Sequence, residues 1–101
     1  MQSPTKGDFS GQVDKMFRVV PAEEAGFDLS LVKLDEIAES DSQETFSLLF
    51  KAPIDAPAIQ TTYPVENEVL GKMELFLVPV EKNQDGLFFE AIFNRMKRSD
   101  Q

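Results

Sequence analysis

The stretch that decides the fold is GKMELFLVPVEKNQDGLFFEAIFN, residues 71–94, which has the pattern of two strands joined by a turn. Asp85 and Gly86 supply turn chemistry between an apolar run at 73–80 and another at 87–93. A hairpin with one wet face alternates apolar and polar residues, whereas both of these runs are apolar at almost every position. The second face of the hairpin therefore needs a cover, and the sequence leaves three candidates: the rest of the chain, a ligand or another protein.

Strand patterns also dominate the rest of the chain. MFRVV (16–20) is a candidate strand, FDLSLVKL (27–34) alternates apolar and polar residues, and ETFSLLFKA (44–52) has an aromatic face. The acidic stretch between the last two cannot bury itself, so we expect a loop or a frayed strand extension. PIDAPAIQTTYP (53–64) carries three prolines and is expected to be a long crossing loop, because proline lacks the donor that a central strand needs.

Only the N-terminus has a helical pattern. Phe9, Val13 and Met16 follow one another at spacings that place them on one face of a short helix over residues 8–16. We expect residues 1–7 to be a disordered tail, 8–96 a single β domain and 97–101 a C-terminal tail. The predicted fold is all-β: a small closed or partly open β-barrel or sandwich of about five to seven mainly antiparallel strands, with a short N-terminal helix.

The expected core collects the inward side chains of these strands. It contains Phe17, Phe27, Leu29, Leu31, Phe46, Leu48, Phe50, Leu75, Leu77, Phe89 and Phe93. In this arrangement the strands at 27–31 and 46–50 cover one face of the final hairpin, and the N-terminal helix and the proline-rich loop cover the other.

Composition narrows the classes of partner. The chain has 101 residues, enough for one domain, and 18 acidic against 10 basic residues give a formal charge of −8. A field of that sign repels phosphate backbones, so nucleic acid is not an expected partner. No apolar run approaches the ~20 residues that span a bilayer, so no membrane is expected either. With no cysteine and no secretory signal at its start, the chain is expected in the cytoplasm.

The sequence also lacks the usual means of catalysis. It contains no His and no Cys, which removes imidazole bases, thiolate nucleophiles and the common zinc ligands. Neither a GxSxG elbow, an SxxK pair nor a glycine-rich phosphate loop occurs. We therefore expect that the protein is not an enzyme and that it has no catalytic residue, cofactor or metal.

The carboxylates offer two weaker candidates. The acids Asp35, Glu36, Glu39, Asp41 and Glu44 have no EF-hand spacing, so a solvated segment is favoured over a calcium site. Glu90 stands in an apolar strand, where it either faces outward, pairs with Lys72, Lys51 or Arg95, or forms an acid–base pair with Glu74.

From Glu44 onward the sequence resembles a family of small uncharacterised bacterial proteins, a domain of unknown function. The shared pieces are FSLLFKAP (46–53), Gln60 and Tyr63, LGKMELFLVPV (70–80) and DGLFFEAIFNR (85–95). Where the family has a His-Pro pair, this chain has Asn67 and Glu68, at a turn that Asn also serves. The resemblance implies no catalytic residues, and its association with phage-tail-like collar and fibre proteins implies assembly.

These observations favour a non-enzymatic structural or protein-interaction module, with a protein partner or self-association. The candidate surface is the second face of the hairpin with its neighbourhood: Tyr63, Phe76, Val78, Phe88 and Ile92. The alternative is a small-ligand-binding barrel, whose cavity would lie between the hairpin and the proline-rich loop and be lined by Phe76, Phe88 and Tyr63.

Overall fold

The computed structural model describes residues 5–21 and 26–96, the side chain of Arg95 excepted, and arranges them as one short helix and six strands. Every strand pairs antiparallel with its neighbours in the order β1-β2-β3-β6-β5-β4, and β4 pairs back on β1 to close an irregular barrel. The predicted all-β fold with a short N-terminal helix is confirmed. The elements are α1 (Lys6–Ser10), β1 (Met16–Val19), β2 (Phe27–Glu39), β3 (Gln43–Ala52), β4 (Thr61–Asn67), β5 (Gly71–Asn83) and β6 (Gly86–Met96).

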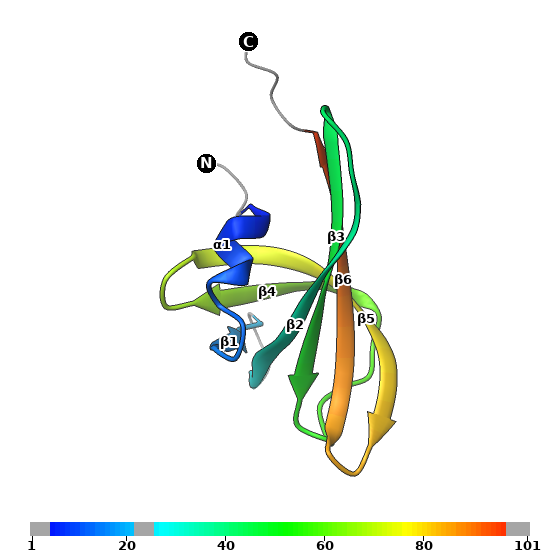
Figure 1. The fold of residues 1–101 in the computed structure, drawn as a ribbon. Helices are drawn as coiled ribbons and strands as arrows, with labels where there is room; N and C mark the ends of the chain where they lie inside the picture. The colour runs from blue at the N-terminus through cyan, green and yellow to red at the C-terminus, as the bar shows by residue number, and fades with distance from the viewer. Residues whose placement is uncertain (1–4, 22–25, 97–101) are drawn as a thin grey trace.

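Two long strands turn the corners of the barrel. β2 pairs first with β1 and then with β3, and β5 pairs first with β4 and then with β6. Both strands contain register shifts, between Leu31 and Lys33 in β2 and between Pro79 and Glu81 in β5, and such bulges bend a strand. β4 and the first half of β5 consequently lie across β3 and β6 (Figure 1).

The interior of the barrel is filled by aromatic and aliphatic side chains. Nearly all of the expected core is buried, and Phe27 and Phe93 are half-buried and pack against it. Tyr63 and Val65, the inward-facing residues of β4, also belong to the core, although they were not among the predicted core residues. Fully buried phenylalanine rings run through the core, from Phe9, Phe17, Phe46, Phe50 and Phe89.

The helix α1 closes one end of the barrel. Its Phe9 is fully buried, and the centroid of its ring lies 6.2 Å from that of Phe46 and 5.2 Å from that of Phe93. Thr5 begins the helix as a capping box, because its hydroxyl oxygen accepts the N–H of Asp8 while the Asp8 carboxylate accepts the N–H of Thr5. An isolated helix of this length is marginal in water, so the packing of Phe9 holds it in place.

Two predictions about this end of the chain are wrong. The helix expected over residues 8–16 ends at Ser10, and Met16 belongs to β1, where it is exposed. Residues 5–7, expected in a disordered tail, cap and begin the helix, because the capping box extends it toward the N-terminus. Residues 1–4 and 97–101, the remainder of the two expected tails, lie outside the described residues, as do residues 22–25.

The proline-rich crossing is shorter than expected. Residues 53–60 form the loop, but β4 begins at Thr61 and includes Pro64, which corrects the expectation that the loop extends to that proline. The N–H of Val20 donates to the carbonyl of Pro64 at the place where β1 ends. The missing donor of Pro64 therefore falls at the last position of the β1–β4 pair, where it costs the sheet least.

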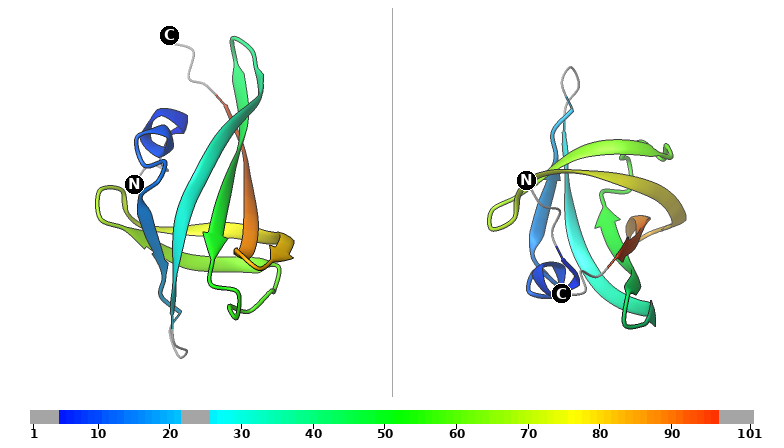
Figure 2. Two further views of the ribbon diagram at one scale, coloured as in Figure 1. Left: turned by 60° about the horizontal axis from the view of Figure 1, so that its bottom comes forward. Right: turned by 90° about the horizontal axis from the view of Figure 1, so that it is seen from above.

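The acidic stretch is a strand extension and not a loop. β2 continues to Glu39 and β3 begins at Gln43, with a tight turn closed by the N–H of Ser40 donating to the carbonyl of Gln43. Together with the end of β6 these strands form a three-stranded projection, which we call the arm: residues 35–39, 43–47 and 92–96. Figures 1 and 2 show the arm standing beyond the body of the barrel.

Candidate functional site

The hairpin of β5 and β6 has one buried face and one exposed face, although both are apolar. Leu75, Leu77, Leu87, Phe89 and Ala91 point into the core. Their neighbours point outward and form what we call the outer strip: Phe76, Val78, Phe88 and Ile92, with Leu49 of β3 beside them. Phe76 is 52% exposed and Ile92 61% exposed, and the other three members are half-buried.

The strand register makes the outer strip continuous. Glu90 pairs with Leu49 on one side and with Val78 on the other. Phe88 and Ile92 flank Glu90 along β6 on the same face, because side chains alternate along a strand. A single carboxylate therefore lies in the middle of an apolar surface that crosses three strands.

Within residues 5–21 and 26–96, no other segment of the chain covers this strip. The N-terminal helix and the proline-rich loop were expected to lie over it, and that prediction is wrong. Phe9 of the helix packs on Phe46 and Phe93, which face the interior, and Ala56 of the loop joins the core. Both segments close openings of the barrel instead, because apolar side chains at the rim of its core would otherwise be exposed to water.

Tyr63 lies apart from the four other residues of the predicted surface. It points into the barrel, its hydroxyl donates to the carbonyl of Ile59 at 2.7 Å, and its ring lies edge-on to Phe89. Phe76 and Phe88 point outward, so these three aromatic side chains do not line one cavity. The sequence signal that could have placed Tyr63 inside is the alternation of TTYPV, which Pro64 obscured.

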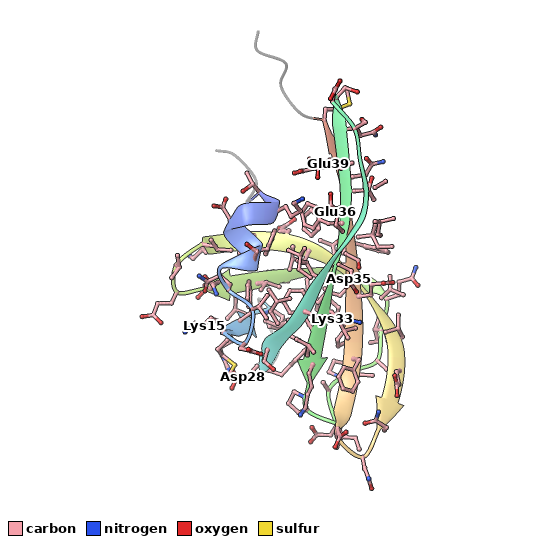
Figure 3. All side chains as sticks on the ribbon, viewed as in Figure 1. Lys15, Asp28, Lys33, Asp35, Glu36 and Glu39 are labelled. Atoms are coloured by element: carbon pink, nitrogen blue, oxygen red, sulfur yellow. The ribbon has the colours of Figure 1, made fainter. Side chains whose placement is uncertain are left out.

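Charged residues surround the strip without forming an acid–base pair. Lys33 pairs across from Leu49, and its ammonium lies 3.4 Å from the Asp35 carboxylate (Figure 3). Glu90 faces outward, as one of the expected alternatives stated. Glu74 precedes Val78 by four positions on β5, ~13 Å at about 3.3 Å per residue, so the register does not bring it beside Glu90.

The acids of the arm point in different directions. Lys6 of α1 contacts Glu39 at 3.2 Å and Glu36 at 3.5 Å, on the face of β2 that looks toward the helix (Figure 3). The hydrogen bond to Glu39, reinforced by the charge of Glu36, raises the pKa of Lys6. Asp35 pairs with Ser47 on the outer face. Across residues 5–21 and 26–96, no three carboxylates gather as metal ligands would.

Asn67 has the structural role that its place before a turn suggested. Its side-chain oxygen accepts the N–H groups of Val69 and Leu70 at 2.8 and 2.7 Å, and its amide nitrogen donates to the carbonyl of Met16. Gly71 then ends the turn at φ +83°, a conformation that glycine adopts readily. Asn67 thus fixes the β4–β5 turn against β1, and the expectation that Asn serves this turn is confirmed.

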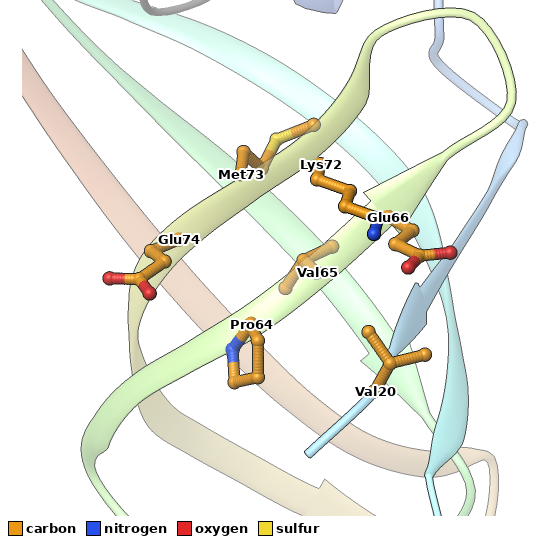
Figure 4. Close-up of a pocket in the computed structure, with 7 residues that line it drawn as sticks. All are labelled: Val20, Pro64, Val65, Glu66, Lys72, Met73 and Glu74. Carbon is orange, nitrogen blue, oxygen red and sulfur yellow. The ribbon is translucent and has the colours of Figure 1, made fainter. Parts of the chain in front are cut away.

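One surface hollow lies over β4 and β5, on another part of the barrel from the outer strip. Its volume is about 270 Å³. Figure 4 shows Glu66 and Lys72 at one side of it and Glu74 at the other. Its lining is completed by Val20, Pro64, Val65 and Met73.

The fold and the strip define a small all-β domain with a filled interior and an apolar outer surface. The chain belongs to the DUF6916 family, a domain of unknown function whose match covers residues 4–93. The resemblance to a family of unknown function is thereby confirmed. No curated protein and no solved structure matches the chain. No helix in the described part of the chain is long and apolar enough to cross a membrane.

Proposed function

We propose that this protein is a non-enzymatic protein-interaction module and that the outer strip is its contact surface. One observation carries the proposal: Phe76 and Ile92 remain more than half exposed on one face of a barrel that closes its other openings with its own segments. Apolar patches of this kind, rimmed by charges, are typical of protein contact surfaces. The absence of His and Cys from the sequence points the same way, since binding needs neither.

The alternative function, binding of a small ligand, has less support. Ligand-binding barrels hold their ligand inside, whereas here phenylalanine rings occupy the interior. The hollow over β4 and β5, at about 270 Å³, is smaller than the ~300–1,000 Å³ of most ligand pockets. A second hollow, beside the β4–β5 turn, has a volume of about 480 Å³, but its lining is mainly polar, whereas ligand pockets are lined mostly by apolar side chains. A role in a phage-tail-like assembly is a finer form of the interaction proposal and rests on the resemblance of the sequence motifs.

A quantitative pull-down with matched variants tests the proposal. The bait is the intact protein in extract of its native host, compared with Phe76→Thr/Ile92→Thr, which makes the strip polar. The control is Ile59→Thr/Val69→Thr, two exposed apolar side chains away from the strip. We expect a stoichiometric partner with the wild-type and control baits that is lost with the strip variant. A partner retained by the strip variant, or no specific partner for any bait, would contradict the proposal.

A further inference from the structure

The end of β6 is an open sheet edge. β5 pairs with β6 from Asn83↔Gly86 to Val78↔Glu90 and then turns away to β4, while β3 follows β6 as far as Met96. Among the described residues, positions 92–96 of β6 therefore have a strand on one side only. This edge shares Ile92 with the outer strip, but the groups that it leaves open are backbone groups.

The register shows which backbone groups face the open side. Asn83 and Gly86 pair across a two-residue turn, and at such a pair the two residues exchange both hydrogen bonds. The groups of Gly86 therefore point at β5, and every second residue of β6 after it does the same. Since β6 runs along β3 without a register shift, the N–H and C=O groups of Ile92, Asn94 and Met96 point to the open side.

The two edges of the arm differ in their protection. The β2 edge has register shifts after Leu31 and after Glu36 and carries several charges, and both features discourage pairing with another strand. The β6 edge has no register shift, and its outward side chains include Ile92, 61% exposed, and Met96, 70% exposed. The arm therefore has one protected edge and one that is ready to accept a strand.

The side chain between Ile92 and Met96 leaves the edge clear. The amide oxygen of Asn94 accepts hydrogen bonds from Gln43 Nε2 at 2.8 Å and from Thr45 Oγ1 at 3.3 Å. Both donors belong to β3, on the opposite side of β6 from the open edge. These bonds draw the Asn94 side chain toward β3 and away from the backbone groups that an added strand would meet.

We propose that this edge pairs antiparallel with the same edge of a second copy of the chain, about a two-fold axis at Asn94. That register places Ile92 of each copy beside Met96 of the other, apolar against apolar, and the two Asn94 residues beside each other. Within residues 92–96, it also pairs all three residues whose backbone groups face outward, with two backbone hydrogen bonds for each pair. A centre at any neighbouring residue leaves at least one of these three unmatched, so this described part of the edge is most complementary to itself in this register.

The occupant follows from that self-complementarity, since a two-fold contact uses the same patch on both partners. The proposal goes beyond the interaction function above, because it uses the backbone edge of β6 and holds whether or not the outer strip binds another protein. Each copy carries a formal charge of −8, so repulsion opposes the dimer. Salt screens such repulsion, and dimerisation should therefore strengthen as ionic strength rises.

Sedimentation equilibrium of three proteins at low and high salt tests the proposal. Asn94→Pro removes the N–H that faces the open edge, where proline costs the monomer no ladder hydrogen bond. Asn94→Ala loses the same side chain and keeps the N–H. We expect the wild type and Asn94→Ala to dimerise within a few-fold of each other, more tightly at high salt, and Asn94→Pro to dimerise at least about 10-fold more weakly.

Two single-cysteine variants, compared by oxidative cross-linking, test the proposal even if Asn94→Pro does not fold. The chain has no cysteine, so Asn94→Cys introduces a single thiol at the proposed axis, where paired Cα atoms ~5.5 Å apart suit a disulfide. Ala38→Cys places the control thiol on the protected edge, at a strand position that is also exposed. Rapid oxidative cross-linking of the first variant only is the expected result.

Three outcomes would overturn the proposal. They are a wild type that stays monomeric at every protein and salt concentration, a folded Asn94→Pro that dimerises like Asn94→Ala, and equal cross-linking of the two cysteine variants. Phe76→Thr separates this proposal from the interaction function, because it alters the strip and leaves the β6 edge intact. A dimer lost on Phe76→Thr would place the self-contact on the strip and contradict pairing at the edge.

Discussion

The two faces of the β5–β6 hairpin are both largely apolar in sequence, but they differ in burial in the structure. Leu77 and Phe89 on the inner face are fully buried, whereas Phe76 and Ile92 on the outer face are more than half exposed. Strand alternation determines which side chains share a face, but closure of the barrel determines which face becomes the core. An apolar face that remains outside a closed barrel is then available for a contact that the chain does not make with itself.

The largest expected effect comes from the inner face. Phe89 is fully buried against the rings of Phe27 and Tyr63, so Phe89→Ala should lower the free energy of unfolding by about 3–5 kcal/mol. Phe88→Ala, its matched control, removes a half-buried ring from the outer face and should cost no more than about 1 kcal/mol. Urea unfolding of both variants measures the difference. Equal losses would mean that the outer face is packed as tightly as the core.

A smaller effect is expected where α1 closes the barrel. Phe9→Ala removes a fully buried ring, but the short helix can relax into the space, so we expect a loss of about 3 kcal/mol, at the low end for such a change. Ser10→Ala on the exposed side of the helix is the control. Thermal unfolding followed by circular dichroism reports both. If Phe9→Ala is as stable as the control, Phe9 does not contribute to the stability of the core and this account of the helix is wrong.

The cap of this helix should matter less. Thr5→Ala removes the hydroxyl that accepts the Asp8 N–H, and N-cap losses of this kind cost about 1 kcal/mol. Thr5→Ser keeps the acceptor and should restore stability to within a few tenths of that of the wild type. Hydrogen exchange at the amide of Asp8 gives the local readout. Equal protection of that amide in the two variants would show that the capping box does not hold the helix in place.

How far the sequence predicts this molecule depends on the range of the interactions concerned. Alternation alone predicted the inward faces of β3 and β5, because the period of a strand is local. Alternation did not predict that β4 begins at Thr61, because Pro64 interrupts the strand pattern there. Tyr63 faces the interior only because β4 pairs with β1 and β5. The acidic end of β2 is a strand only because β3 pairs with it across a tight turn.

The candidate site divides in the same way. Phe76, Val78, Phe88 and Ile92 were expected on one face, and the structure places them on one face. Whether the outer face is covered depends on where α1 and the proline-rich loop pack. Both pack at the rim of the core, and the core is assembled from residues along the whole chain, so a local sequence pattern does not predict their positions. Its role as a contact surface stays a prediction that the pull-down tests.

The most direct test compares two adjacent residues of β5 that differ in the face they occupy. Phe76→Thr and Leu77→Thr introduce the same β-branched residue, which suits a strand at either position. Chemical denaturation should show a loss of about 2–5 kcal/mol for Leu77→Thr and of less than about 1 kcal/mol for Phe76→Thr. A loss for Phe76→Thr as large as that for Leu77→Thr in a monomer would show that the chain covers its own outer face, and would contradict the account.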